Sequence, residues 1–351
     1  MVNTNRKVYM DCLRIIACFL VIFCHGPGYF AYQNNPSPAL TYFYLFFTMS
    51  GRICVPIFFM LTGALMFPRT TTYREILSKR IPRILSALLI FSLLYYLARN
   101  KNDFSSVSVY DFVKKVIIDD LAGAYWYLYA YMALLLFLPF MQRIAHHFTT
   151  ADFLLLLFLR FIILGVIPIA NHFLTQLGFP AFCYTPNFSV PFATEQFLFY
   201  PFIGYYLEHV FDFRRLSGKH LGCMTLVSCL CIAVASIVTY HQGITSGFTQ
   251  DYVMTFDYIL AIHFYVLVKY CFTKFQISDC HNILSLISSL TFGIYLMEPI
   301  LKCLCKEEFF NILIPESYPV TNSVLWCLFT FALCGLITHF MKKIPVVKNL
   351  L

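Results

Sequence analysis

Long apolar runs separated by short polar segments make up the whole chain. Ten of these runs approach the ~20 residues that an α-helix needs to cross a bilayer. They cover residues 9–30, 42–67, 84–98, 124–142, 153–170, 191–207, 221–240, 252–272, 283–304 and 323–341. The polar segments between them are too short to fold as a soluble domain. The pattern predicts an all-α integral membrane protein: one domain over residues 1–351, a bundle of about ten transmembrane helices.

Composition agrees with this pattern, since 60% of the residues are hydrophobic and 12% are charged. Soluble domains carry roughly 25% charged residues, so this chain has too little polar surface to stay dispersed in water. The first apolar run is too long for a cleaved signal peptide, and no cleavage site of small residues follows it. We therefore expect a multi-pass protein of the plasma or inner membrane.

The basic residues predict which side of the membrane each loop faces. Of the 25 Lys and Arg, sixteen fall in segments on the side of the N-terminus, six in the opposite loops, and three within the runs. Because cytoplasmic loops carry an excess of Lys and Arg, both termini are predicted to be cytoplasmic. This distribution also explains the net charge of +8 without nucleic acid, and we expect none as a partner.

The chain contains fourteen cysteines, which raises the question of disulfides or metal ligands. It has no C-x-x-C pair, and most cysteines lie within the apolar runs, where a thiol acts as a small buried apolar group. We therefore expect no metal site. Cys183, Cys303 and Cys305 fall near the outer face in this topology, and one disulfide among them is the alternative.

Two ionisable residues stand in the first apolar run. An ionisable side chain at membrane depth costs at least ~2.5 kcal/mol, so it points to a function by default. Arg14 and His25 are separated by ten residues. Eleven steps of ~100° make three turns plus ~20°, so the two side chains project from one face of a helix. Arg14 is then near the cytoplasmic surface and His25 in the outer part of the bilayer.

Three carboxylates fall at about the depth of His25 when each span is measured at ~1.5 Å per residue. They are Glu195, Asp257 and Glu298. A histidine and carboxylates in one layer suit a site that handles protons. The alternatives are a histidine that only packs, a Glu298 that bonds backbone donors freed by Pro299, and an Asp257 that is merely interfacial.

Four further arginines lie in or beside the runs. Arg80 and Arg83 stand three residues apart in KRIPRIL, at the start of the third run, and share a helical face. Paired guanidiniums suit phosphate oxygens, although inside-loop charges for topology are the alternative. Arg52 and Arg160 are expected to be structural, paired with carbonyls or carboxylates. The chain has no glycine-rich phosphate loop, HExxH or GxSxG, so hydrolase and nucleotidase functions lack support.

Six short motifs follow one another along nearly the whole chain. They are R-x10-H at Arg14 and His25, VPIFFMLTGALMF at Val55–Phe67, R-x-x-R at Arg80 and Arg83, YWYL at Tyr125–Leu128, FIGYYL at Phe202–Leu207 and SLTFGIYLMEP at Ser289–Pro299. Each is weak alone, but their order resembles the acyltransferase-3 superfamily of bacterial membrane O-acyltransferases. Two positions depart from the family's pattern: Glu298 stands where a histidine is frequent, and Thr62 replaces a serine.

The resemblance implies an acyl transfer across the membrane. Family members pass an acyl group, usually acetyl, from cytoplasmic acyl-CoA to a hydroxyl of an extracytoplasmic glycan or glycolipid. No metal is implied. The roles carried over are CoA phosphate binding for Arg14, Arg80 and Arg83, general base for His25, and orientation of its ring by Glu298 or Glu195.

The acceptor is expected at the outer loops. The segment 171–191 carries aromatic and amide side chains without charge, which suits a neutral sugar or an ordinary interfacial belt. The rival function is a secondary transporter or a flippase for lipid-linked glycans, because intramembrane His and Glu also relay protons. The enzyme is favoured by the paired arginines at one helix end and by charges at only two depths.

Overall fold

The computed structural model describes residues 7–34, 37–118, 121–180, 190–246, 252–275, 281–312 and 318–351. Every regular element in these residues is a helix. The α-helices are α1 (Val8–Cys24), α2 (Pro38–Arg52), α3 (Cys54–Met66), α4 (Tyr73–Glu75), α5 (Ile81–Arg99), α6 (Val109–Ile118), α7 (Trp126–His147), α8 (Thr150–Arg160), α9 (Ile167–Gln176), α10 (Pro191–Thr194), α11 (Gln196–Tyr205), α12 (Gly218–Ser246), α13 (Asp257–Lys274), α14 (His281–Ile312), α15 (Pro319–Met341) and α16 (Pro345–Lys348). The all-helical fold is therefore confirmed.

Short 3-10 and π-helical turns join several of these α-helices. The 3-10 turns are η1 (Pro27–Tyr29), η2 (Ala31–Asn34), η4 (Phe104–Ser106) and η7 (Phe213–Arg215). The π-helical turns are η3 (Ile76–Arg80), η5 (Phe161–Val166) and η6 (Tyr206–Val210). η3 and η5 make continuous helices of α4–α5 and α8–α9.

Seven helices in the described part of the chain are long and apolar enough to cross a membrane. They are Pro38–Met66, Tyr73–Arg99, Trp126–His147, Thr150–Gln176, Gly218–Ile244, Asn282–Lys306 and Pro319–Met341. The other three predicted runs contain α1, α11 and α13. α1 has 17 residues and α11 has 10, which is short for a span, and α13 contains Asp257, Lys269 and Lys274. A multi-pass membrane protein is thus supported, and the count of about ten crossings stays a prediction.

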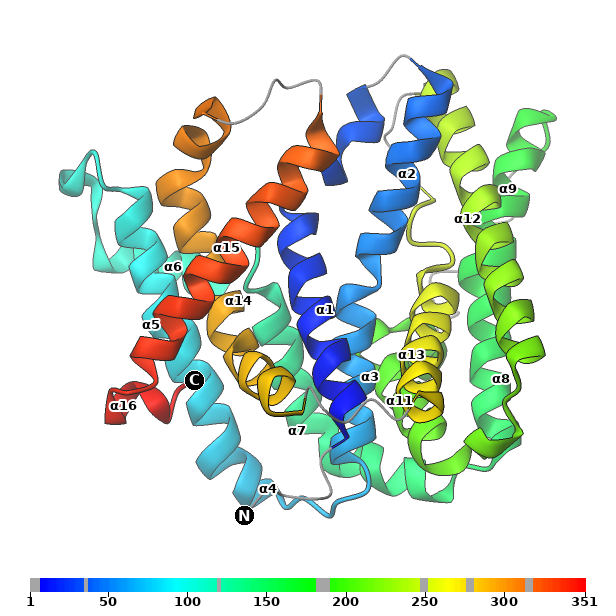
Figure 1. Cartoon of the computed structure of the whole chain (residues 1–351), viewed down its shortest axis with the longest axis horizontal. Coiled ribbons are helices and arrows are strands. Elements are labelled where there is room, and N and C mark those ends of the chain that lie inside the picture. The colour runs from blue at the N-terminus through cyan, green and yellow to red at the C-terminus, as the bar shows by residue number, and fades with distance from the viewer. Residues whose placement is uncertain are drawn as a thin grey trace.

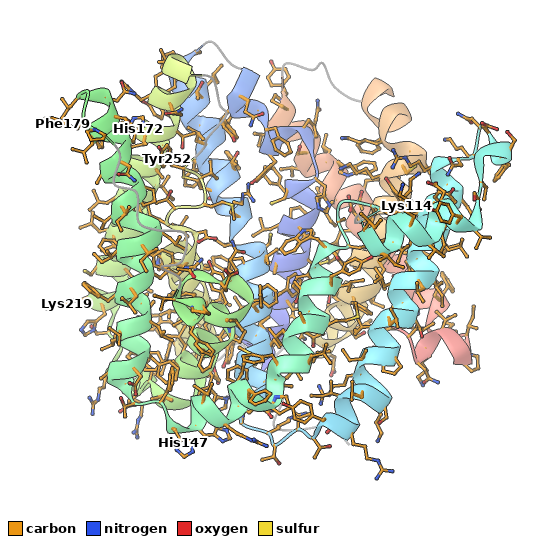
Figure 2. All side chains as sticks on the ribbon, turned by 180° about the vertical axis from the view of Figure 1, so that it is seen from behind. Lys114, His147, His172, Phe179, Lys219 and Tyr252 are labelled. Atoms are coloured by element: carbon orange, nitrogen blue, oxygen red, sulfur yellow. The ribbon has the colours of Figure 1, made fainter. Side chains whose placement is uncertain are left out.

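α1 lies in the middle of the bundle, where it packs against α2, α3, α13, α14 and α15 (Figure 1). The start of α1 and the end of α15 lie at the same, lower end of the bundle in Figure 1. In Figure 2, Lys114, His172 and Phe179 lie toward the upper end and His147 at the lower end. Loops predicted to face opposite sides of the membrane are therefore at opposite ends of the bundle.

Prolines and glycines set where the helices of the site end. α1 stops at Cys24 rather than running to residue 30, because Gly26 and Pro27 follow and begin a 3-10 turn. α2 and α3 form one span with a break at Ile53. Pro56 has no N–H to donate to the carbonyl of Arg52, four residues earlier, so the helix is interrupted there. Both breaks lie on the wall of the candidate site.

A glycine contact brings α3 and α11 into backbone contact. A Cβ atom on Gly63 would lie 1.8 Å from the carbonyl oxygen of Pro201, and one on Gly204 would lie 1.9 Å from that of Met60. No side chain fits at either position, so glycine is required for the two helices to cross this closely. The crossing fixes α11, whose N-cap is the candidate residue Glu195.

The apolar pattern did not predict α6, which is too short to cross a membrane. Its apolar side chains are strongly exposed, including Val109, Tyr110, Ile117 and Ile118. Lys115 pairs with Asp111 at 2.7 Å on the same helix. An amphipathic helix of this kind suits the membrane surface.

Candidate active site

His25 and Glu298 form a hydrogen-bonded pair between α1 and α14. The Nδ1 atom of His25 lies 2.8 Å from the Oε2 atom of Glu298. His25 is the residue that caps the C-terminus of α1, and Glu298 is 1% exposed in the middle of α14. Since Nδ1 is engaged by the carboxylate, Nε2 is the ring nitrogen that remains for a substrate.

Hydrogen bonds to the backbone hold both members of this pair in place. The N–H of Gly28 donates to Ser323 Oγ at 2.7 Å, and Thr48 Oγ1 donates to the carbonyl of Tyr29 at 2.7 Å. On the other side, the Tyr125 hydroxyl donates to the carbonyl of Leu296 at 2.7 Å. The turn after His25 and the helix that carries Glu298 are therefore both fixed. Tyr125 belongs to the YWYL motif, for which the sequence alone predicted no role.

α14 runs through Pro299 without interruption. The carboxylate of Glu298 is thus used by His25, and the alternative in which it bonds backbone donors at a helix break is not what the structure shows.

A cavity of about 910 Å³ is lined by His25 of this pair, by Arg14 near the other end of α1 and by Arg83 of α5. Arg14 and His25 both line it, as expected for side chains on one face of α1. Its wall also contains aromatic residues to which no role was assigned from the sequence, although five of them belong to the quoted motifs. These are Tyr29, Phe30, Phe58, Trp126, Tyr127, Tyr131, Phe197, Phe292 and Tyr295. A largely apolar cavity with a small number of polar groups in its wall is the usual form of a small-molecule site.

The three candidate phosphate-binding arginines occupy different positions. Arg14 lines the cavity and donates to Ser288 Oγ at 2.9 Å and to Asp11 at 3.2 Å. Arg83 also lines it and donates from Nε to the carbonyl of Leu350 at 3.1 Å.

Arg80 instead pairs with Glu75 at 2.8 Å and adjoins the cavity through Met66, whose sulfur is 3.8 Å from its Nη1. The helix here begins at Tyr73, capped by Thr72, and passes through the π-helical turn η3 before Arg83. R-x-x-R is therefore inside a helix and not at its start.

Glu195 lines the same cavity but takes a place separate from the His25 pair. It caps the N-terminus of α11, is exposed to the cavity, and makes no hydrogen bond to His25. Of the two carboxylates proposed to orient the ring, the structure brings Glu298 to it.

Arg160 and Asp257 form a buried ion pair close to the residues that precede Glu195. Both are 2% exposed, with 3.9 Å between Nη2 and Oδ1. Arg160 also donates to the carbonyls of Ala193 and Thr194, at 2.9 and 3.1 Å. These bonds fix the short segment that ends at Glu195, so the structural role expected for Arg160 is met.

Arg52, unlike Arg160, does not form the hydrogen bonds to carbonyls or carboxylates that were expected for it. It lines the cavity, yet within the described residues its guanidinium makes no hydrogen bond or ion pair. Its charge sits over the ring of Tyr29, 5.0 Å from the centroid. The signal for its importance was present in the sequence as a charge within an apolar run.

Two expectations fall partly outside the described residues. The segment 171–191 includes 181–189, and the disulfide alternative includes Cys183, which lies in the same stretch. Cys303 and Cys305 are described and carry free thiols.

Comparison with known proteins gives one match. The sequence model of the acyltransferase-3 family, described as an acyltransferase domain, matches residues 7–345. No curated protein and no solved structure matches the chain. The match covers nearly the whole chain, from the residue before α1 to the first residue of α16, and includes both members of the His25–Glu298 pair. The chain is a member of the acyltransferase-3 family of membrane acyltransferases.

Proposed function

We propose that the protein transfers an acetyl group from cytoplasmic acetyl-CoA to a hydroxyl of an extracytoplasmic glycan or glycolipid. The observation that carries this proposal is one cavity lined by His25, which is hydrogen-bonded to Glu298, and by Arg14 and Arg83, with His25 and Arg14 toward opposite ends of α1. A donor with an anionic head and a long neutral arm fits such a cavity, because its charge and its reactive end are far apart.

The arginine end supports binding of the donor. Arg14 and Arg83 line the cavity, and their guanidiniums favour phosphate oxygens. Arg80 does not line the cavity, but its Nη1 atom contacts Met66, which does. In this proposal Arg14 and Arg83 bind the CoA phosphates, and Arg80 adds positive charge at the entrance.

The histidine end supports the chemistry. The acceptor oxygen attacks the thioester carbonyl carbon while Nε2 of His25 takes the hydroxyl proton. The carbonyl bond re-forms as the carbon–sulfur bond breaks, and His25 returns the proton to the leaving CoA thiolate. Glu298 keeps the ring in the tautomer with hydrogen on Nδ1 and stabilises the imidazolium between these steps. It acts through His25 and is a positioning residue.

A second cavity supports a route for the acceptor. It has a volume of about 570 Å³ and shares Thr194, Gln196 and Met254 with the first. Its remaining polar groups include Asn171 and Tyr252, and Figure 2 shows Tyr252 beside His172 in the upper part of the bundle. Glu195 lies between Thr194 and Gln196, where the two cavities meet, and in this proposal it contacts the acceptor hydroxyls.

The test is transfer of label by the purified full-length protein in lipid nanodiscs. Radiolabelled acetyl-CoA is supplied with a glycolipid and polysaccharide extract of the source membranes, and label is followed in the glycan and in released acetate. We expect CoA release that depends on the protein and matches the label transferred. Absence of both products from folded wild-type protein would overturn the proposal and leave the transporter function to be tested.

A further inference from the structure

Arg52 is a cation in the membrane-embedded part of the protein that makes no hydrogen bond or ion pair within the described residues, although its charge acts on the carboxylate of Asp257. It stands at the break between α2 and α3, within the span Pro38–Met66. Its Nε atom is buried and has no hydrogen-bond partner among the described residues. Arg160, by comparison, has two carbonyls, a hydroxyl and a carboxylate around it.

A guanidinium that lacks hydrogen bonds within a membrane span destabilises the protein. Buried polar groups in proteins are nearly always hydrogen-bonded, and charged ones within a membrane are rare and functional. The side chain lines the cavity, so a bound substrate can supply the missing partner. Two carboxylates, Glu195 and Asp257, line the same cavity. Asp257 is 3.9 Å from Arg160 and also interacts electrostatically with Arg52, but it accepts no hydrogen bond from Arg52 within the described residues.

The position of Arg52 is fixed beside His25. Its guanidinium lies over the ring of Tyr29, in the turn that follows His25. The preceding residue, Gly51, packs on the residue before His25, since a Cβ atom there would be 3.2 Å from the sulfur of Cys24. The cation is therefore held beside the turn that follows His25.

We propose that Arg52 is a further catalytic residue, whose guanidinium stabilises the negative oxygen of the tetrahedral intermediate. This inference rests on the proposed function. When the acceptor oxygen bonds to the thioester carbon, the carbonyl oxygen gains the charge and becomes the acceptor that Arg52 lacks. The charge returns to the carbonyl bond when the thiolate leaves. Because the ring of Tyr29 already holds the cation, little reorganisation is needed as the charge develops.

The experiment compares Arg52→Gln, Arg52→Lys and Arg215→Gln with wild type in nanodiscs. Arg215 is a matched control, an arginine at the protein surface with its side chain 83% exposed. The readouts are transfer of labelled acetyl, label in free acetate, acetyl-CoA affinity and melting temperature. For Arg52→Gln we expect kcat to fall by ~10²–10³ with acetyl-CoA affinity unchanged. Arg52→Lys should keep more activity, and Arg215→Gln should match wild type.

Chemical rescue separates catalysis from folding. In Arg52→Ala, methylguanidinium added to the assay should restore part of kcat, whereas a purely structural role predicts no effect of the added cation.

Two results would overturn the assignment while leaving the proposed function intact. One is an Arg52→Gln protein with kcat within threefold of wild type. The other is a raised KM for the acceptor with unchanged kcat, which would make Arg52 a binding site for an anionic acceptor. Failure of the wild type to transfer or release acetyl would count against the function itself.

Discussion

The Nδ1 atom of His25 lies 2.8 Å from the Oε2 atom of Glu298, although the two residues are 273 positions apart in the chain. The contact joins the first helix of the bundle to α14, and within the described residues the histidine is the one hydrogen-bond partner of the buried carboxylate. A buried carboxylate removed from water needs such a partner. One bond therefore has two effects: it gives the Oε2 atom of Glu298 a partner, and it fixes the tautomer of His25.

Glu298→Gln tests this coupling. The amide keeps a hydrogen-bond acceptor for Nδ1 but loses the charge that stabilises imidazolium, so we expect kcat to fall by roughly 10- to 1000-fold, less than in His25→Ala. In the His25→Ala background the same change should have little further effect, because the two residues act as a unit. Additive losses in the double variant, measured as kcat per folded molecule, would argue for independent roles.

The arginines are expected to differ in their effect on the donor. Arg83→Ala and Arg14→Ala each remove a charge from the cavity wall and should weaken acetyl-CoA binding by about 10- to 150-fold, or ~1.5–3 kcal/mol. Arg80→Ala should weaken it less, since Arg80 is paired with Glu75. Isothermal titration calorimetry in nanodiscs gives the affinities. Equal affinity for wild type and an Arg14/Arg83 double variant would rule out the phosphate site.

Gly63→Ala tests the contact between α3 and α11. The new methyl group would overlap the backbone carbonyl of Pro201, which cannot move aside without separating the two helices. We expect a loss of at least ~1–3 kcal/mol in stability and a lower melting temperature. Gly222→Ala in α12 is the control, because a Cβ atom there meets nothing within 4 Å. Equal melting temperatures for the two variants would show that the helices do not approach this closely.

Sidedness can be measured with single cysteines in a cysteine-depleted protein. Thr70 and Gln176 are exposed and lie in segments predicted to be inside and outside, respectively. A membrane-impermeant maleimide should label Gln176→Cys in intact cells, and Thr70→Cys only after the membrane is opened. The reverse pattern would place the arginine end of the cavity outside and remove the basis for a cytoplasmic donor.

Hydrophobic pattern predicted the helices well because a membrane span needs a long apolar run wherever it packs. It predicted their ends less well. α1 is shorter than its run because Gly26 and Pro27 end it, and α2 breaks from α3 at Ile53 because of Pro56. Those residues carry a local signal that the apolar count does not weigh. α6 was missed because its apolar face is too short to resemble a span.

The sequence predicted the depth of the site residues in the membrane but not which neighbouring helix each side chain faces. Glu195 and Glu298 were both placed near His25 by counting residues, and only the packing of α14 on α1 selects Glu298. Likewise, spacing puts Arg80 and Arg83 on one face, whereas Arg80 is drawn to Glu75. Rotation of each helix about its own axis depends on all of its neighbours, and one sequence does not fix it. The sequence shows the charge of Arg52, but it does not show that the buried Nε atom lacks a hydrogen-bond partner among the described residues.

The most direct test of the account is the turnover of His25→Ala with saturating labelled acetyl-CoA, expressed per folded molecule. If His25 is the general base, kcat falls by ~10²–10⁴ while the affinity for acetyl-CoA stays near that of wild type. A histidine that only packs predicts a lower melting temperature with nearly normal turnover in the molecules that fold. A His25→Ala protein with kcat within threefold of wild type would contradict the account.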